Sequence, residues 1–153
     1  MRACEWLARV RLASSRIEGL RRELSVLEDA RRDCLPWTTR GSATHGSMGG
    51  THSDPTATEA QARIEGLDER IADVRAACDE CERIVGDCLR MLDIMRHELG
   101  ERHADVIELY YVDRADTWSE VAWEMGVSRR TVCRMRDEAF VWIDCVCPRF
   151  VLS

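Results

Sequence analysis

Apolar residues recur at helical spacing along two stretches of the chain, with polar residues between them. In both stretches the steps alternate between four and three residues, the heptad spacing of helices that pack against each other. The pattern predicts one helix over 1–35, interrupted only at Arg31, and a longer helix over 57–100. The apolar positions are Trp6, Val10, Ala13, Ile17, Leu20, Leu24, Leu27 and Cys34, then Ala60, Ile64, Leu67, Ile71, Val74, Cys78, Cys81, Val85, Cys88, Leu92, Met95 and Leu99.

The segment 36–56 separates the two predicted helices. It is rich in Gly, Ser and Thr and has no apolar periodicity, so it buries too little surface to offset the entropy of ordering. We therefore expect a flexible loop. Two heptad helices joined in this way favour an antiparallel, coiled-coil-like helical hairpin. The helices pair either within one chain or between the chains of a homodimer, and the pattern does not decide between the two.

Shorter elements follow the second heptad helix. Gly100 is expected just past its C-terminus, where glycine is favoured. Apolar residues over 104–110 predict a short helix, and 113–116 has the composition of a turn. Thr117 precedes Glu120 by three residues, a capping-box pattern that predicts a helix through Met125.

The last predicted helix begins after Ser128, which is expected to cap it, and runs to about Cys145. Together the elements predict an all-α protein. Its long N-terminal helical hairpin is followed by a C-terminal helix-turn-helix domain over 101–153.

Residues 121–132 have the pattern of a helix, a tight turn and a second helix. Ala122 is small, as is needed where two helices cross. Gly126 can adopt a positive φ at the turn without steric cost. Val127 and Val132 are expected to close the small core beneath the turn. These four residues are the predicted structural positions of a helix-turn-helix.

The last helix combines an apolar face with a basic one. Val132, Met135, Ala139 and Ile143 recur every three or four residues and predict its buried stripe. The other side carries four Arg between 129 and 136, and a recognition helix presents its N-terminal residues to the major groove. Arg suits both guanine and phosphate. The candidate DNA-binding residues are Ser128, Arg129, Arg130, Thr131, Arg134 and Arg136.

The chain as a whole is acidic, with a net charge of −6, and it contains no Lys, so every basic side chain apart from His is Arg. Such a charge provides no general attraction to nucleic acid, and DNA binding has to depend on a local basic patch. The alternative interpretation is that the Arg-rich side of the last helix is only a solvent-exposed face.

Three segments resemble region 4 of sigma-70-type factors: Ile107–Tyr111, Thr117–Ala122 and Gly126–Val132. In that family, region 4 reads promoter DNA and contacts RNA polymerase, so the resemblance implies double-stranded DNA and RNA polymerase as partners. It covers about 102–145. By this resemblance the DNA-contacting positions are Ser128, Arg129, Arg130, Thr131 and Arg134.

The order of hairpin, Gly/Ser loop and region 4-like unit also resembles small phage and prophage proteins such as the ArpU-type late transcription regulators. This looser resemblance covers most of the chain. No segment resembles the sigma region that melts promoter DNA, so the resemblance does not imply a complete sigma factor.

Eight Cys are many for a chain of this length. Cys78 and Cys81 have the spacing of half a zinc or redox motif, yet both lie with Cys88 on the heptad seam, where a small apolar residue fits. A zinc site needs four converging ligands, so core packing is the expectation and no metal or cofactor is predicted. Cys145 and Cys147 form a weaker pair of the same kind.

Four His complete the inventory of possible ligands. His97 and His103 could join a Cys pair in a site, including one shared between chains, and this alternative stays open. His45 and His52 lie in the predicted loop and are expected to be solvated. No nucleophile–His–carboxylate arrangement and no phosphate-binding loop is apparent, so an enzyme is not expected.

Two Trp flank the first helix of the motif. Trp118 is expected to pack against Tyr110 or Tyr111. For Trp123, core or edge packing is expected, with a partner contact as the alternative. No apolar run is long enough to span a membrane and no secretory segment is apparent, so we expect a cytoplasmic location. The resemblance implies a bacterial cell or a phage-infected host as the setting.

These patterns predict a sequence-specific DNA-binding transcription regulator that forms a homodimer through its heptad helices, and the resemblance implies that it is of sigma region 4-like type and of phage or prophage origin. A small terminase-type DNA-packaging subunit is one alternative, because it also joins a helix-turn-helix to an oligomerising helical part. A coiled-coil adaptor that does not bind DNA is the other.

Overall fold

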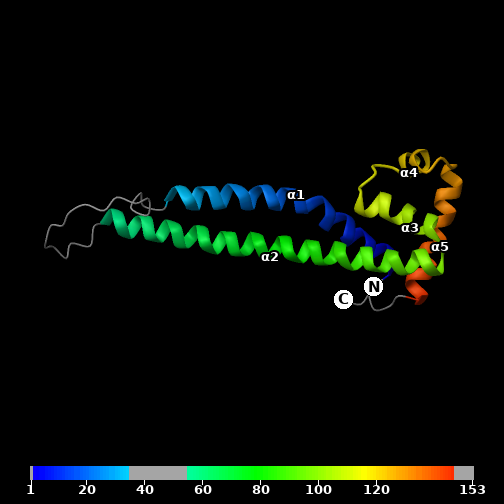
Figure 1. Cartoon of the computed structure of the whole chain (residues 1–153), viewed down its shortest axis with the longest axis horizontal. Helices are drawn as coiled ribbons and strands as arrows, with labels where there is room; N and C mark the ends of the chain where they lie inside the picture. Colours follow the sequence, from blue (N-terminus) through cyan, green and yellow to red (C-terminus); the bar gives the residue numbers. More distant parts are fainter. Residues whose placement is uncertain (1, 35–54, 147–153) are drawn as a thin grey trace. The chain divides into compact units, whose positions relative to one another are not determined.

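The computed structural model describes residues 2–34 and 55–146, and all regular structure in these ranges is helical (Figure 1). The all-α prediction is therefore confirmed. The predicted loop lies outside the described residues except at its end, where the second long helix begins. The elements are α1 (Ala3–Cys34), α2 (Pro55–Glu98), α3 (Glu101–Ile107), the π-helix η2 (Glu108–Val112), α4 (Trp118–Glu124) and α5 (Arg129–Val146).

The described residues divide into two compact units, and both long helices contribute to each. One unit spans Leu20–Ala77. The other contains the residues up to Gly19 together with those from Cys78 onward, so the start of α1 belongs to the same unit as α3, η2, α4 and α5.

In the unit Leu20–Ala77, α1 and α2 pair along their heptad positions within one chain. Leu27 and Ile71 are buried. Arg31, the polar interruption of the heptad pattern, is half-buried and ion-paired with Asp68 of α2, which explains how this position accommodates a charge. Two further ion pairs join the helices, Arg70–Glu23 at 3.5 Å and Arg75–Glu28 at 2.8 Å. Exposed pairs of this kind contribute little stability, so the apolar seam holds the helices together.

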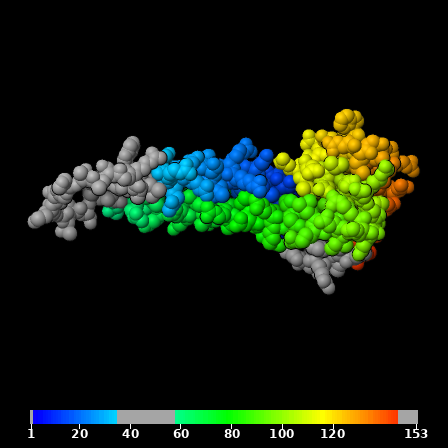
Figure 2. All heavy atoms as spheres, in the orientation of Figure 1, coloured from blue at the N-terminus to red at the C-terminus, as the bar shows by residue number. Residues whose placement is uncertain are grey.

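In the other unit the heptad positions of α1 and α2 form one wall of a larger core. Leu7 and Met91 are fully buried although neither lies on the predicted seam. They are buried because α3, η2 and α5 cover a second face of the helix pair. These helices place Ile107, Tyr111 and Ile143 in the same core. Figure 2 shows the surface of α3–α5 continuous with the first part of α1 and the last part of α2.

A smaller second core lies beneath α4. It consists of Val106, Val121, Ala122, Val132 and Met135, and it joins α3, α4 and α5. Tyr110 and Trp118 are half-buried and pack against both cores. The second core therefore fixes α5 against α4, as a helix-turn-helix requires.

The seam cysteines Cys78, Cys81 and Cys88 are buried in the core, as predicted. Burial, together with the nearby Glu108 carboxylate, raises the pKa of the Cys88 thiol to about 12. This thiol therefore stays protonated near neutral pH, which suits an apolar packing role.

Candidate nucleic-acid interface

The first helix of the motif, α4, begins with the predicted cap. The Thr117 hydroxyl accepts a hydrogen bond from the Glu120 main-chain N–H at 3.2 Å. The Glu120 carboxylate accepts in return from the Asp116 N–H at 2.7 Å, one residue earlier than in the usual capping box. The cap fixes the residue at which the chain enters α4.

The turn after α4 is a Schellman motif centred on Gly126. This residue has φ of +64°, the left-handed conformation that favours glycine. The Val127 N–H donates to Ala122 O at 3.0 Å, and the Gly126 N–H donates to Trp123 O at 3.1 Å. Ala122 is buried and Val127 is half-buried against the second core. The structure thus places the predicted helix-turn-helix residues together at this turn.

The second helix of the motif, α5, begins after Ser128. The Ser128 hydroxyl accepts from the Thr131 N–H at 3.1 Å, so the predicted N-cap is confirmed. The hydroxyls of Ser128 and Thr131 also lie 2.8 Å apart and share a hydrogen bond. The predicted apolar stripe of α5 is buried. Val132 and Met135, near the start of the helix, lie in the second core, and Ala139 and Ile143 lie in the larger core.

The outer side of α5 presents Arg129, Arg130 and Arg134 to solvent. Arg129 and Arg130 form no ion pair with any residue that the structure describes. Arg134 has 71% of its side chain exposed, and its Nε lies 3.7 Å from Glu138 Oε1. A shallow groove follows this side of the helix, and its lining residues are Arg130, Thr131, Cys133, Arg134, Asp137, Glu138 and Val141.

The charge of this side changes sign along α5. Its first two turns carry the three exposed Arg, whereas Asp137 and Glu138 follow in the next turn. His103 of α3 shares a hydrogen bond of 2.7 Å with Glu138, which contacts Arg134 through its other oxygen. Only the N-terminal half of α5 is therefore suited to the negatively charged surface of DNA.

Arg136 does not lie with the other candidate DNA-binding residues. Its guanidinium lies 5.2 Å from the Trp118 ring centroid and forms an ion pair with Asp137 at 2.6 Å. One quarter of its side chain is exposed. The structure thus separates Arg136 from the open side of α5 and places it against the aromatic part of the core.

The two Trp of the motif differ in their surroundings. Trp118 stacks on Tyr110, with ring centroids 3.8 Å apart, and also contacts Tyr111, as predicted. For Trp123, the prediction of core or edge packing is wrong, because this residue is 83% exposed. The inner side of α4 is filled by Val121, Ala122 and the half-buried Met125, and Trp123 lies on its outer side.

The sequence interpretation missed two residues that hold this region in place, Arg11 and Ser14 of α1. Both donate hydrogen bonds to main-chain carbonyls near the end of η2. No local pattern marks them, because their partners lie 98 to 104 residues further along the chain.

Among the described residues, no group of three or more His, Cys, Asp or Glu side chains is placed to hold a metal ion. Cys147, His45 and His52 lie outside the described residues. None of the helices in the described ranges is long and apolar enough to cross a membrane.

Residues 97–141 match the family model of Sigma-70, region 4. The matched segment contains α3, η2, α4 and most of α5, whereas α1 and almost all of α2 lie outside it. The match confirms the region 4 resemblance for this segment and with it the DNA-binding helix-turn-helix type. It does not support an ArpU-type or phage origin, nor the packaging-subunit and adaptor alternatives. Searches of curated proteins and of solved structures found no match.

Proposed function

We propose that this protein is a sequence-specific DNA-binding transcription regulator of sigma region 4 type, which inserts the N-terminal half of α5 into the major groove. The observation that carries the proposal is the exposed, basic first half of α5 within the segment that matches Sigma-70, region 4. Ser128, Arg129, Arg130, Thr131 and Arg134 are the proposed DNA-contacting residues.

The chemistry of these side chains suits two kinds of contact. Arg130 and Arg134 lie one helical turn apart on the same side of α5, and a guanidinium can bind guanine O6 and N7 together or pair with a phosphate. The polar start of α5 at Ser128 favours a nearby phosphate through the helix dipole. Because the acidic turn at Asp137 and Glu138 repels the DNA backbone, we propose that α5 enters the groove by its N-terminal end.

The test compares the wild-type chain with the Arg130→Ala/Arg134→Ala double variant on duplexes that the wild type selects from a random pool. An Arg that reads a base contributes about 1–3 kcal/mol, and its loss relaxes specificity at that base pair. An Arg that contacts a phosphate lowers the slope of log K against log salt by about 0.9 when it is removed. We expect the double variant to lose affinity and to show one or both of these signatures.

A matched control is the Arg16→Ala/Arg63→Ala variant. It removes the same charge, and both residues are exposed and form no ion pair within the described ranges. We expect it to bind the selected duplexes as the wild type does. The proposal is wrong if the wild type shows no salt-dependent duplex binding. It is also wrong if the Arg130→Ala/Arg134→Ala variant binds the duplex as tightly as the Arg16→Ala/Arg63→Ala variant.

The partners and setting complete the proposal. We propose that the protein acts in the cytoplasm of a bacterial cell or a phage-infected host, contacts RNA polymerase, and binds DNA as a homodimer whose half-sites lie about 34–36 Å apart. Because the heptad positions at Leu27 and Ile71 are buried within one chain, the dimer uses the outward sides of the same helices. Sedimentation of the chain with and without a two-half-site duplex tests the dimer, and a monomeric complex contradicts it.

A further inference from the structure

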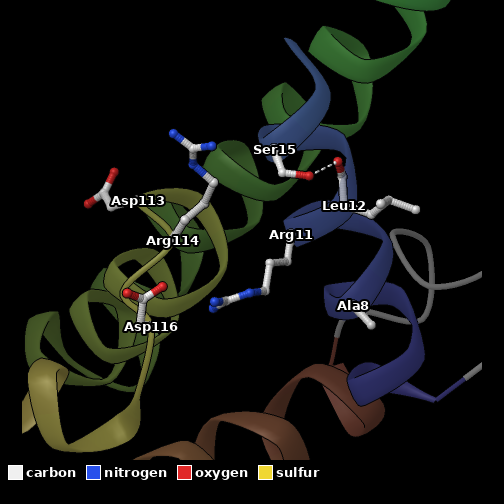
Figure 3. A pocket seen from close by; sticks show the side chains of 7 residues that line it. All are labelled: Ala8, Arg11, Leu12, Ser15, Asp113, Arg114 and Asp116. Atoms are coloured by element: carbon white, nitrogen blue, oxygen red, sulfur yellow. Dashed lines mark hydrogen bonds between the residues drawn. The ribbon is translucent and has the colours of Figure 1, made fainter. Parts of the chain in front are cut away.

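Side chains of α1 hold main-chain carbonyls of the region 4-like segment. Arg11 Nη1 lies 2.5 Å from Tyr110 O and 3.0 Å from Ala115 O, and Ser14 Oγ lies 2.6 Å from Val112 O. Figure 3 shows the Arg11 side chain extending from α1 toward the turn that carries Asp116. These contacts join α1 to the end of η2 and to the turn that leads into α4.

Two of the three carbonyls that Arg11 and Ser14 bind, Tyr110 O and Val112 O, belong to the end of η2, and the third, Ala115 O, lies in the turn that follows. The last carbonyls of any helix lack partners within it and need donors from elsewhere. The first two carbonyls of η2 accept from residues just after the helix, since the Asp113 and Ala115 N–H groups bond to Glu108 O and Leu109 O. Tyr110 O and Val112 O are bonded instead by α1. A guanidinium in this place is also favoured by the helix dipole.

The same guanidinium begins a series of ring contacts that reaches α5. The Arg11 guanidinium carbon lies 4.2 Å from the Tyr110 ring centroid. Tyr110 and Trp118 stack with an interplanar angle of 13°. Arg136 of α5 lies over the Trp118 ring. Because Trp118 is the first residue of α4, the contacts run from α1 through η2 and α4 to the helix that carries the candidate DNA-binding residues.

A second contact anchors α1 near the other end of α5. The Ala3 N–H donates to the Asp144 carboxylate at 2.7 Å, which satisfies a main-chain donor at the start of α1. Trp6 and Leu7 are buried in the core that contains Ile143. Helix α1 therefore contacts α5 near its C-terminus and, through the ring series, near its middle.

The geometry points to Arg11, which lies outside the segment matching Sigma-70, region 4, as a positioning residue for DNA binding. Arg11 holds the end of η2 and the Tyr110–Trp118 stack, and these set the orientation of α4 and of the first half of α5. The start of α1 that makes these contacts, from Ala3 to Ser14, is accordingly part of the DNA-binding unit. This inference rests on the proposed function.

The test uses the full chain and the duplex that the wild type selects. Arg11→Ala removes the carbonyl and ring contacts, and Arg16→Ala is the matched control because it removes the same charge from an exposed position of the same helix. We expect Arg11→Ala to bind roughly 2- to 30-fold more weakly than Arg16→Ala, the usual range for residues that act through a contact network. The salt slope should stay at the wild-type value, because Arg11 contacts no phosphate.

Arg11→Lys separates the two kinds of contact that Arg11 makes. An ammonium group donates to the carbonyls but lacks the planar guanidinium that lies on the Tyr110 ring. We expect this variant to recover part of the lost affinity. A loss of folding stability alone would leave the affinity unchanged at temperatures where every variant is fully folded.

Amide hydrogen exchange provides a readout that does not depend on DNA. Arg11→Ala should accelerate exchange over 108–124 and 129–136 relative to Arg16→Ala. If the two variants agree in both affinity and exchange, the positioning role is refuted. If the wild type binds no duplex, the proposed function is wrong, and so is the role of Arg11 in DNA binding. The exchange comparison still decides in that case whether Arg11 orders α4 and α5.

Discussion

The buried Cys88 thiol should make the protein unusually sensitive to alkaline pH. Burial first, and the Glu108 carboxylate second, raise the pKa of this thiol from 9.0 to about 12. As the pH rises, the unfolded chain therefore releases this proton before the folded chain does. The contribution to stability is fully present below about pH 9 and is lost progressively up to about pH 12.

The magnitude follows from the size of the shift. At about 1.36 kcal/mol for each pKa unit, a rise from 9.0 to about 12 corresponds to about 4 kcal/mol, lost at about 1.4 kcal/mol per pH unit. This is a large share of the roughly 5–15 kcal/mol by which domains are stable. Burial, followed by the neighbouring Tyr110, also raises the pKa of Tyr111 to about 12, which acts in the same direction. Because the chain has no Lys, no Lys ammonium group titrates between about pH 9 and pH 12.

Urea unfolding from about pH 8 to about pH 12, in the presence of a reductant, measures this dependence. Cys88→Ala should lower the stability at pH 8, because packing is lost, yet make the alkaline slope shallower by about 1.4 kcal/mol per pH unit. Cys145→Ala is the control, because it removes a thiol that is exposed and not packed in the core. The reasoning is refuted if Cys88→Ala and the wild type lose stability with the same slope.

Substitutions at three positions test the geometry of the motif. Gly126→Ala should lower the unfolding free energy by roughly 1–2 kcal/mol. The loss comes from backbone strain alone, because an added Cβ meets no atom within 4 Å. Gly126→Asn should lower it by less, and equal losses would contradict this account. Ser128→Ala should cost about 1 kcal/mol and accelerate amide exchange in the first turn of α5; unchanged exchange would show that the cap is dispensable. Trp123→Ser should change the unfolding free energy by less than about 0.5 kcal/mol, because the side chain is 83% exposed, and a larger loss in a thermal melt would show that it packs.

Helix ends and buried helix faces could be predicted from the sequence, because they depend on residues that are close together in the chain. The helices of the last third begin and end where Thr117, Gly126 and Ser128 indicated, because a cap or a left-handed turn is a contact between residues only a few positions apart. The buried side of α5 was predictable for a similar reason, since helical geometry alone places Val132 and Ala139 on one face.

Trp123 and Arg136, whose surroundings differ from those predicted, depend on contacts with other helices. Whether Trp123 packs or points to solvent depends on which side of a seven-residue helix meets the core, and both sides of α4 carry a Trp. The location of Arg136 depends on the Trp118 and Phe140 rings that lie near it. In each case an amphipathic side chain has two suitable environments, and only the packing of other helices selects one.

The sequence by itself determined that this protein is helical, where its short helices begin and end, and that one of them carries an Arg-rich N-terminal half. Each of these properties depends on residues within one or two helical turns of each other. Only the tertiary structure decided that Leu7 and Met91 are buried and that Arg11 and Ser14 bind carbonyls of η2. Those contacts join residues about a hundred positions apart. They arise because α3, η2 and α5 cover a second face of the α1–α2 pair, which the heptad pattern alone does not mark.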